Sequence, residues 1–128
     1  KIQVVENIND KIDKYSKLVL IPANLKNFLL DKNIDLFINI NSFQEMTNLE
    51  VTNYFNIIKN NKSLLYTSNR DYKKLYGGEE LIFDNYDWEG ADKIFYETCP
   101  WMKYFYSTKF PFIHKYDSKV MHALANYK

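Results

Sequence analysis

The chain has 128 residues, of which 46% are hydrophobic and 26% are charged, so its composition is that of one globular domain and excludes a disordered chain. The net charge is +1 with both signs interspersed, and Arg70 is the only arginine, which argues against a nucleic-acid partner. Cys99 is the only cysteine, which excludes an intrachain disulfide and indicates a reducing, cytoplasmic compartment.

Membrane and metal functions are also disfavoured by the sequence. No apolar run approaches the roughly 20 residues of a membrane-spanning helix. The two histidines, His114 and His122, are separated and no cysteine cluster accompanies them, so no metal site is predicted.

Apolar runs and one helical pattern alternate in the first part of the chain. Three runs are predicted strands: Lys17–Pro22, Ile34–Ile40 and Ser63–Thr67. Between the last two, Thr47 and Glu50 form a capping box that predicts the start of a helix. Apolar residues then recur at helical spacing, at Val51, Tyr54, Phe55 and Ile58.

A strand, a helix and a second strand with short connections predict a βαβ crossover. We expect the strands over 34–40 and 63–67 to be parallel neighbours. Both are apolar on both faces, which is typical of inner strands covered by helices. The predicted fold class is therefore α/β.

The second part of the chain, from Asp71, is rich in aromatic residues. It contains a predicted turn at Gly77-Gly78, a short strand at Leu81–Phe83, a helix at Ala91–Thr98 and aromatic strands at Met102–Thr108 and Phe112–Tyr116. We expect antiparallel pairing at a sheet edge here, because Pro111 would interrupt an inner ladder. The stretch from Lys119 to Tyr127 is compatible with a strand or a helix.

Polar side chains follow two of the predicted parallel strands, where ligands bind in open α/β sheets. If these strands are neighbours, one edge of the sheet brings together Asn39, Asn41, Ser42, Gln44, Glu45, Asn69 and Arg70. The simpler interpretation is that polar residues collect at strand ends because loops face water.

Several of these side chains suit catalysis or binding. Glu45 is the candidate general base and precedes a helix N-terminus, which favours a carboxylate. Arg70 suits a phosphate or carboxylate, or an ion pair with Glu45 or Asp71. His114 is a candidate substrate contact, although an edge histidine without a catalytic role is the simpler interpretation.

Nucleotide-binding motifs are absent from the sequence. The three glycines, Gly77, Gly78 and Gly90, do not lie between a strand and a helix, and no phosphate-binding loop or nucleophile elbow occurs. The residues of this chain therefore provide no usual nucleotide cradle.

The chain resembles the putative sugar O-methyltransferase family. The resemblance covers roughly residues 17 to 128 and is most recognisable in Asp35–Met46 (DLFININSFQEM). It continues through Tyr54-Phe55, Asn69-Arg70, Tyr72-Lys73-Lys74, Asp84–Trp88 and Cys99-Pro100-Trp101. It implies part of a Rossmann-like methyltransferase sheet, with parallel strands and an antiparallel C-terminal edge.

The resemblance also implies S-adenosylmethionine as cofactor and a sugar or sugar-phosphate acceptor in bacterial surface-polysaccharide biosynthesis. Glu45 would be the base, Asn39 would contact the cofactor, and the remaining candidates would hold the sugar: Asn41, Ser42, Gln44, Asn69, Arg70 and His114. The first strand and glycine-rich loop of the family would lie upstream of residue 1. We therefore expect residues 1–128 to be a single domain, the C-terminal part of a longer enzyme, and inactive alone.

Two other functions stay open. One is a non-catalytic assembly domain of methyltransferase ancestry. The missing glycine loop is consistent with this function. The other is a carbohydrate-binding module, suggested by the second part of the chain, which is rich in Tyr and Trp and includes Trp88 and Trp101. Exposed, coplanar aromatic rings would support this function, and buried ones would exclude it. A sheet cut beside its central strand would also expose an edge for pairing with another copy of the chain.

Overall fold

The computed structural model describes residues 1–108, 110–115 and 119–128. Two compact units make up the chain, Lys1–Asn33 and Ile34–Lys128, and each is described on its own. The expectation that residues 1–128 form one domain stays a prediction.

The first unit contains a small parallel sheet. Strand β1 (Ile2–Val4) pairs with β2 (Leu18–Leu20), and the 3-10 segment η1 (Ala23–Leu29) follows. Strand β2 confirms the strand predicted over Lys17–Pro22. The amide of Gln3 fastens the connecting loop: its nitrogen donates to the Lys11 carbonyl at 2.8 Å and its oxygen accepts from the Asp13 backbone N–H at 2.8 Å.

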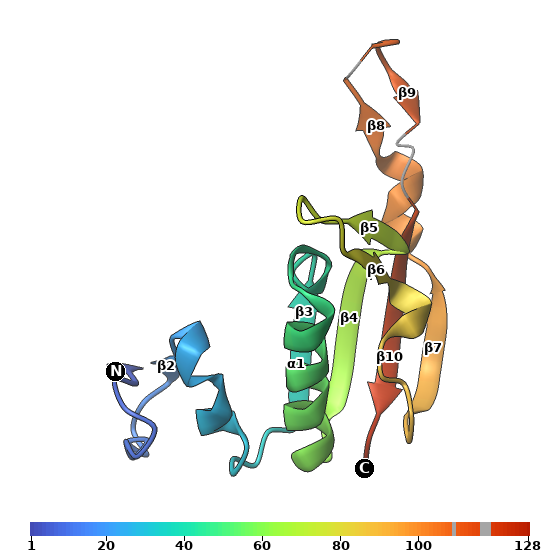
Figure 1. The fold of residues 1–128 in the computed structure, drawn as a ribbon. Helices are drawn as coiled ribbons and strands as arrows, with labels where there is room; N and C mark the ends of the chain where they lie inside the picture. The colour runs from blue at the N-terminus through green and yellow to red at the C-terminus, as the bar shows by residue number, and fades with distance from the viewer. Residues whose placement is uncertain (109, 116–118) are drawn as a thin grey trace. The chain divides into compact units, whose positions relative to one another are not determined.

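The second unit is built on a mixed four-stranded sheet (Figure 1). Its order is β3 (Leu36–Ile40), β4 (Leu64–Arg70), β10 (Val120–Asn126) and β7 (Asp92–Thr98). Strands β3 and β4 are parallel, whereas β10 is antiparallel to both of its neighbours. The α/β class and the parallel βαβ unit are therefore confirmed.

Helix α1 (Asn48–Asn60) connects the two parallel strands and begins where the capping box predicts. The Thr47 hydroxyl accepts a hydrogen bond from the Glu50 backbone N–H at 3.3 Å. The last turn is tied down by an ion pair of 2.6 Å between Lys59 and Asp87. A lysine here also compensates the partial negative charge of the helix C-terminus.

The core lies between α1 and one face of the sheet. Phe55 is fully buried at its centre, with T-shaped contacts to Trp88 and Tyr127. Leu65 of β4 and Ala123 of β10 are the sheet residues of this core that are also fully buried, together with Ala125. The cluster is completed by Phe43, Val51, Ile58, Leu81, Phe83, Tyr86, Met121, Ala125 and Tyr127.

Two hairpins accompany the sheet. Strands β5 (Tyr72–Lys74) and β6 (Glu80–Ile82) form the first, which confirms the predicted Gly77-Gly78 turn, and η3 (Phe83–Asn85) follows. After β7 comes η4 (Pro100–Tyr104), and then the short hairpin of β8 (Tyr106–Ser107) and β9 (His114–Lys115).

The helix predicted over Ala91–Thr98 is wrong, because these residues form strand β7. Pairing with β10 along Asp92–Thr98 decides the conformation, and the β-branched and aromatic side chains here suit a strand. The stretch from Lys119 to Tyr127, left open by the sequence, is also a strand. Pairing between these two strands confirms an antiparallel C-terminal part of the sheet.

The aromatic strands are only partly as predicted. Within Met102–Thr108 the strand is limited to Tyr106–Ser107, because Pro100 at the first position starts a 3-10 turn instead. Within Phe112–Tyr116 it is limited to His114–Lys115, and Tyr116 lies outside the described residues. These strands form a separate hairpin, so they are not the edge of the four-stranded sheet.

The sequence pattern predicts an inner strand at β3, but β3 ends the four-stranded sheet in the part of the chain that the structure describes. Its Phe37 packs against the core, while the alternate side chains point to the opposite face. Those side chains, Leu36, Ile38 and Ile40, are 44%, 65% and 56% exposed.

Replacing Phe55 with alanine should lower the free energy of unfolding by about 3–5 kcal/mol, because it leaves a cavity at the centre of the core. Chemical denaturation followed by circular dichroism measures the change. Leu49→Ala is the matched control on the same helix, since Leu49 is 69% exposed, and it should change stability by less than about 0.5 kcal/mol. Equal losses in both variants would contradict this packing.

Candidate functional site

The carboxyl ends of β3 and β4 lie side by side, as predicted. The Asn41 backbone N–H donates to the Ser68 carbonyl at 2.8 Å and thereby joins the two loops. After β3 the chain turns through η2 (Phe43–Glu45) before α1 begins. This edge of the sheet is where an open α/β fold binds its ligands.

Buried amide groups hold this edge together. The Asn69 side chain is fully buried, and its nitrogen donates to the side-chain oxygens of Asn39 at 2.9 Å and Thr67 at 2.8 Å. Its oxygen accepts from the Gln44 backbone N–H at 3.2 Å. The Asn39 oxygen also accepts from the Phe43 backbone N–H at 3.2 Å. These bonds fix η2 against the ends of both strands.

Gln44 continues the network toward the surface. Its side-chain oxygen accepts from the Arg70 backbone N–H at 2.8 Å, and its side-chain nitrogen donates to Glu45 Oε1 at 3.2 Å. The same carboxylate oxygen pairs with Lys73 Nζ at 3.2 Å. The structure thus brings together five predicted residues: Asn39, Gln44, Glu45, Asn69 and Arg70.

Three of these residues form hydrogen bonds that stabilise the fold. Asn39, Gln44 and Asn69 each bond backbone or side-chain groups of the neighbouring loop. Their predicted roles with substrate and cofactor stay predictions. Ser42 precedes η2 and is half-buried, with its carbonyl accepting from the Glu45 N–H at 3.1 Å.

An aromatic pocket opens on the sheet face opposite α1. Its volume is about 190 Å³, and it lies where β3 and β4 end and β7 turns into η4. Asn41 at its rim has a backbone φ of +55°, a conformation that asparagine tolerates better than most residues. The remaining lining residues are Ile40, Tyr66, Ser68, Cys99, Trp101, Phe105 and Val120.

Tyr66 is held in the wall of this pocket by aromatic packing. Its ring makes T-shaped contacts with His122 at 6.2 Å and with Phe95 at 6.3 Å. Burial, and secondarily the nearby Cys99, raise the pKa of the Tyr66 phenol above its ordinary value. A phenol is protonated at neutral pH even at its ordinary pKa, and the raised pKa keeps Tyr66 protonated to higher pH.

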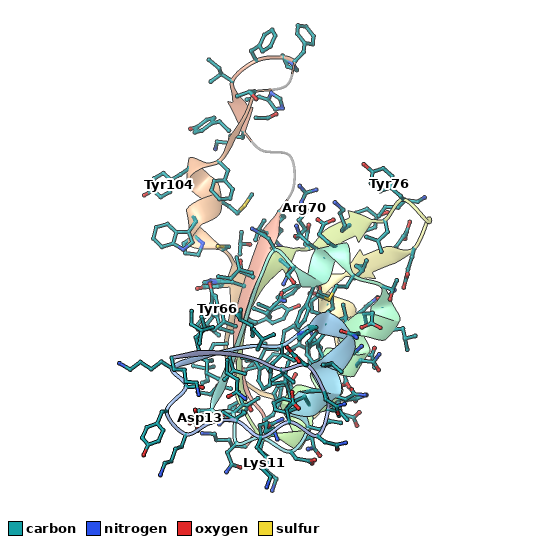
Figure 2. The ribbon with its side chains drawn as sticks, turned by 90° about the vertical axis from the view of Figure 1, so that its left-hand side faces the viewer. Lys11, Asp13, Tyr66, Arg70, Tyr76 and Tyr104 are labelled. Carbon is teal, nitrogen blue, oxygen red and sulfur yellow. The ribbon has the colours of Figure 1, made fainter. Side chains whose placement is uncertain are left out.

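Glu45 lines a different hollow. That hollow has a volume of about 290 Å³ and is formed by Glu45, Lys73, Lys74, Leu75 and Tyr76. In Figure 2 Arg70 lies at the end of its strand, while Tyr76 lies at the turn of the β5–β6 hairpin. The structure places Asn41 in the aromatic pocket and Glu45 in the hollow beside Lys73.

The structure places His114 in the β8–β9 hairpin, outside both the amide network and the aromatic pocket. Its Nδ1 contacts the carbonyl oxygen of Pro111 in the same hairpin. Its role as a substrate contact stays a prediction.

Several lining residues were missing from the sequence-based site. Strand alternation places Tyr66 on the same face as Ser68, and that period of two could have identified it. Trp101, part of the carbohydrate-binding alternative, is 64% exposed in the pocket. By contrast, Trp88 is partly buried in the core, where its Nε1 donates to the Phe83 carbonyl at 3.0 Å. Phe105 also lines the pocket, beside Tyr66 and Trp101. No local sequence pattern predicts that position.

None of the three glycines lies in a strand-to-helix turn. Gly77 and Gly78 lie in the β5–β6 turn and Gly90 precedes β7, and a Cβ added at any of them meets nothing within 4 Å.

Among the described residues, no group of three or more His, Cys, Asp or Glu could hold a metal ion. Within the same residues, no helix combines the length and apolar character needed to cross a membrane.

Comparison of the chain with protein-family models, with curated proteins and with solved structures finds no match.

Replacing Asn69 with aspartate should destabilise the second unit by about 1–3 kcal/mol at neutral pH, because Asn39 and Thr67 lose their donor and a carboxylate is buried. Burial would raise the folded-state pKa of the new carboxyl above its unfolded value, so the lost stability should return as the pH falls through the folded pKa.

The measurement is urea denaturation of the wild type and the variant at pH 7 and at pH 4–5. Asn56→Asp, at an exposed position of α1, is the control and should show neither effect. A loss for Asn69→Asp that does not depend on pH would contradict the buried network.

Proposed function

We propose that this chain is the acceptor-binding part of an S-adenosylmethionine-dependent O-methyltransferase that acts on a sugar hydroxyl, in the biosynthesis of a bacterial surface polysaccharide. The observation that carries the proposal is the aromatic pocket at the carboxyl ends of β3 and β4. Its position is that of a substrate site in an open α/β sheet.

The lining of the pocket suits a pyranose ring. A sugar has apolar C–H faces that pack on aromatic rings, and Trp101 and Phe105 offer such rings at the mouth. Its hydroxyls need hydrogen-bond partners, which the side chains of Asn41, Ser68 and Tyr66 provide. The protonated phenol of Tyr66 would donate to an acceptor oxygen.

The sheet also supports the proposal. Its last two strands, β7 and β10, form the antiparallel pair that the resemblance implies, next to the parallel pair of β3 and β4. A Rossmann-like methyltransferase sheet, of which the second unit would be one half, is therefore the finer fold that we propose.

Methyl transfer to a hydroxyl is an in-line displacement, so the acceptor oxygen has to be aligned and its proton removed. The described residues would hold the acceptor and exclude water from its apolar face. Since no glycine of this chain lies in a strand-to-helix turn, the methyl donor is proposed to be held by polypeptide outside residues 1–128. Asn39 at the end of β3 is the residue of this chain proposed to face the donor, and we expect the 128 residues alone to be inactive.

Binding of the sugar can be tested on the chain itself. With 5-fluorotryptophan in place of both tryptophans, the ¹⁹F spectrum contains one resonance from Trp88 and one from Trp101, and Trp101→Phe assigns them. Titration with methyl glucopyranoside and methyl mannopyranoside should shift the Trp101 resonance and leave that of Trp88 in place, because Trp88 is part of the core. No shift, or a shift of Trp88 alone, would contradict the proposed acceptor pocket.

Glu45 is the general base that the resemblance implies. It lines the hollow beside Lys73 and not the aromatic pocket, so this role requires the acceptor hydroxyl to extend from the pocket to that hollow. In the longer polypeptide that supplies the cofactor half, Glu45→Gln should lower the rate of methyl transfer from labelled S-adenosylmethionine by about 100-fold or more, with cofactor binding unchanged. Glu89→Gln, at an exposed position, is the control. If Glu45→Gln leaves turnover intact, its ion pair with Lys73 is structural and the assignment of the base is wrong.

A carbohydrate-binding module is the second candidate, and the exposed Trp101 favours it. Sugar binding by the chain, combined with no methyl transfer by the longer polypeptide, would support that function instead.

A further inference from the structure

A row of three polar side chains crosses the sheet beside the aromatic pocket. In the strand register His122 of β10 lies opposite Ser68 of β4 on one side and opposite Glu97 of β7 on the other. Their neighbours Ala123 and Tyr96 pack in the core, so the row lies on the face opposite α1, where Ser68 lines the pocket. Directly opposed residues have Cβ atoms about 5 Å apart, so a hydroxyl, an imidazole and a carboxylate lie within reach of one another.

His122 is buried in this row with one ring nitrogen unsatisfied. The residue is 9% exposed, and its ring packs on Phe95 at 4.8 Å and on Tyr66 at 6.2 Å between ring centroids. Its Nε2 is buried and forms no hydrogen bond with good geometry among the described residues, although Oε1 of Glu97 lies 3.4 Å away. Glu97 is exposed, so a small rotation of its side chain aligns the carboxylate with an Nε2–H. An unsatisfied buried nitrogen is costly, which favours that bond.

We propose that His122, held by Glu97, is a positioning residue that directs the hydroxyl of Ser68, so that the pocket binds a sugar through a free hydroxyl donating to Ser68 Oγ. The inference rests on the proposed sugar pocket. A neutral imidazole carries one N–H, so an Nε2–H bonded to Glu97 leaves Nδ1 as an acceptor. The two nitrogens lie on opposite sides of the ring, so Nδ1 is directed toward β4 and accepts from the Ser68 O–H.

This chain of hydrogen bonds determines which groups of a sugar the pocket accepts. A Ser68 hydroxyl that has given its one proton to His122 offers only lone pairs to the pocket. Its partner on the sugar must therefore be a hydroxyl with its own proton. A methyl ether at that position has no proton to donate and loses the bond. The pocket therefore prefers the unmethylated acceptor over the methylated product, which favours release of the product.

Protonation of His122 reverses the direction of these bonds. An Nδ1–H donates to Ser68 Oγ, the Ser68 proton turns toward the pocket, and the acceptor for the sugar hydroxyl is lost. Histidine is the side chain that ordinarily changes its charge between pH 5 and 8. Among the described residues, the titratable groups facing His122 are Tyr66 of β4 and Glu97 of β7. Affinity for the sugar should therefore fall with pH, by about tenfold for one hydrogen bond.

Titration of the chain labelled with 5-fluorotryptophan by methyl glucopyranoside and methyl mannopyranoside, at pH values from 8 to 5, tests the inference. The wild type should bind about tenfold more weakly at the acid end. His122→Phe keeps an aromatic ring on Phe95 and Tyr66, and its affinity should no longer depend on pH. Ser68→Ala should bind weakly at every pH. Circular dichroism checks that both variants fold.

Glu97→Gln tests the carboxylate separately. Without its negative charge the imidazolium is less favoured, so the midpoint of the pH dependence should move to lower pH. Glu89→Gln, at an exposed position, is the matched control and should keep the wild-type midpoint. Sugar binding that does not change with pH in the wild type overturns the inference and leaves the acceptor pocket intact. The absence of sugar binding at every pH contradicts the pocket, and the inference fails with it.

The tautomer of His122 is a readout that needs no ligand. In the chain labelled with ¹⁵N-histidine, long-range ¹H–¹⁵N correlation spectra distinguish an Nε2–H from an Nδ1–H imidazole, and His122→Phe assigns the signals. The neutral ring of His122 should carry its proton on Nε2, as the Glu97 contact requires. A neutral ring protonated on Nδ1 overturns the inference, because it could not accept from Ser68.

Discussion

Packing of α1 against a single face of the sheet is the constraint on which the second unit depends. Phe55 and Ile58 direct the helix onto Leu65 and the alanines of β10, and small side chains there let the helix and the strands approach closely. This arrangement assigns each strand residue to the core or to the opposite face. The aromatic pocket and the exposed row of β3 are both consequences, because they use the alternate residues of the same strands.

The amide network at the strand ends has a complementary role. Asn69 is fully buried yet polar, and each of its hydrogen bonds reaches a different part of the edge: β3, β4 and η2. Buried polar groups of this kind are costly unless they are satisfied, and satisfied networks define one geometry. Some of the polar residues that predict a binding site in the sequence, such as Asn69, therefore stabilise the backbone around that site. Aromatic residues line much of the pocket.

The sequence allowed prediction of the parts of the fold that depend on local pattern. The N-cap at Thr47, the turn at Gly77-Gly78 and the parallel crossover are confirmed, because local backbone chemistry and periodicity specify them. The segment Ala91–Thr98 was predicted wrongly, since its conformation depends on β10, more than twenty residues later in the chain. The grouping of Asn39, Gln44 and Asn69 followed from strand adjacency, whereas the pocket required knowledge of which side chains η4 brings over Tyr66.

The position of β10 has a consequence for the order of folding. This strand lies between β4 and β7 and pairs along its length with both, although it is synthesised after both. Until it leaves the ribosome, β4 is paired only with β3, and β7 lacks the strand that it pairs with in the sheet. The sheet is therefore dominated by contacts between residues far apart in the sequence, which slows folding and delays its completion. During translation the nascent chain would therefore present one open edge of β4 together with the unpaired β7, and exposed strand edges of this kind are prone to association with other chains.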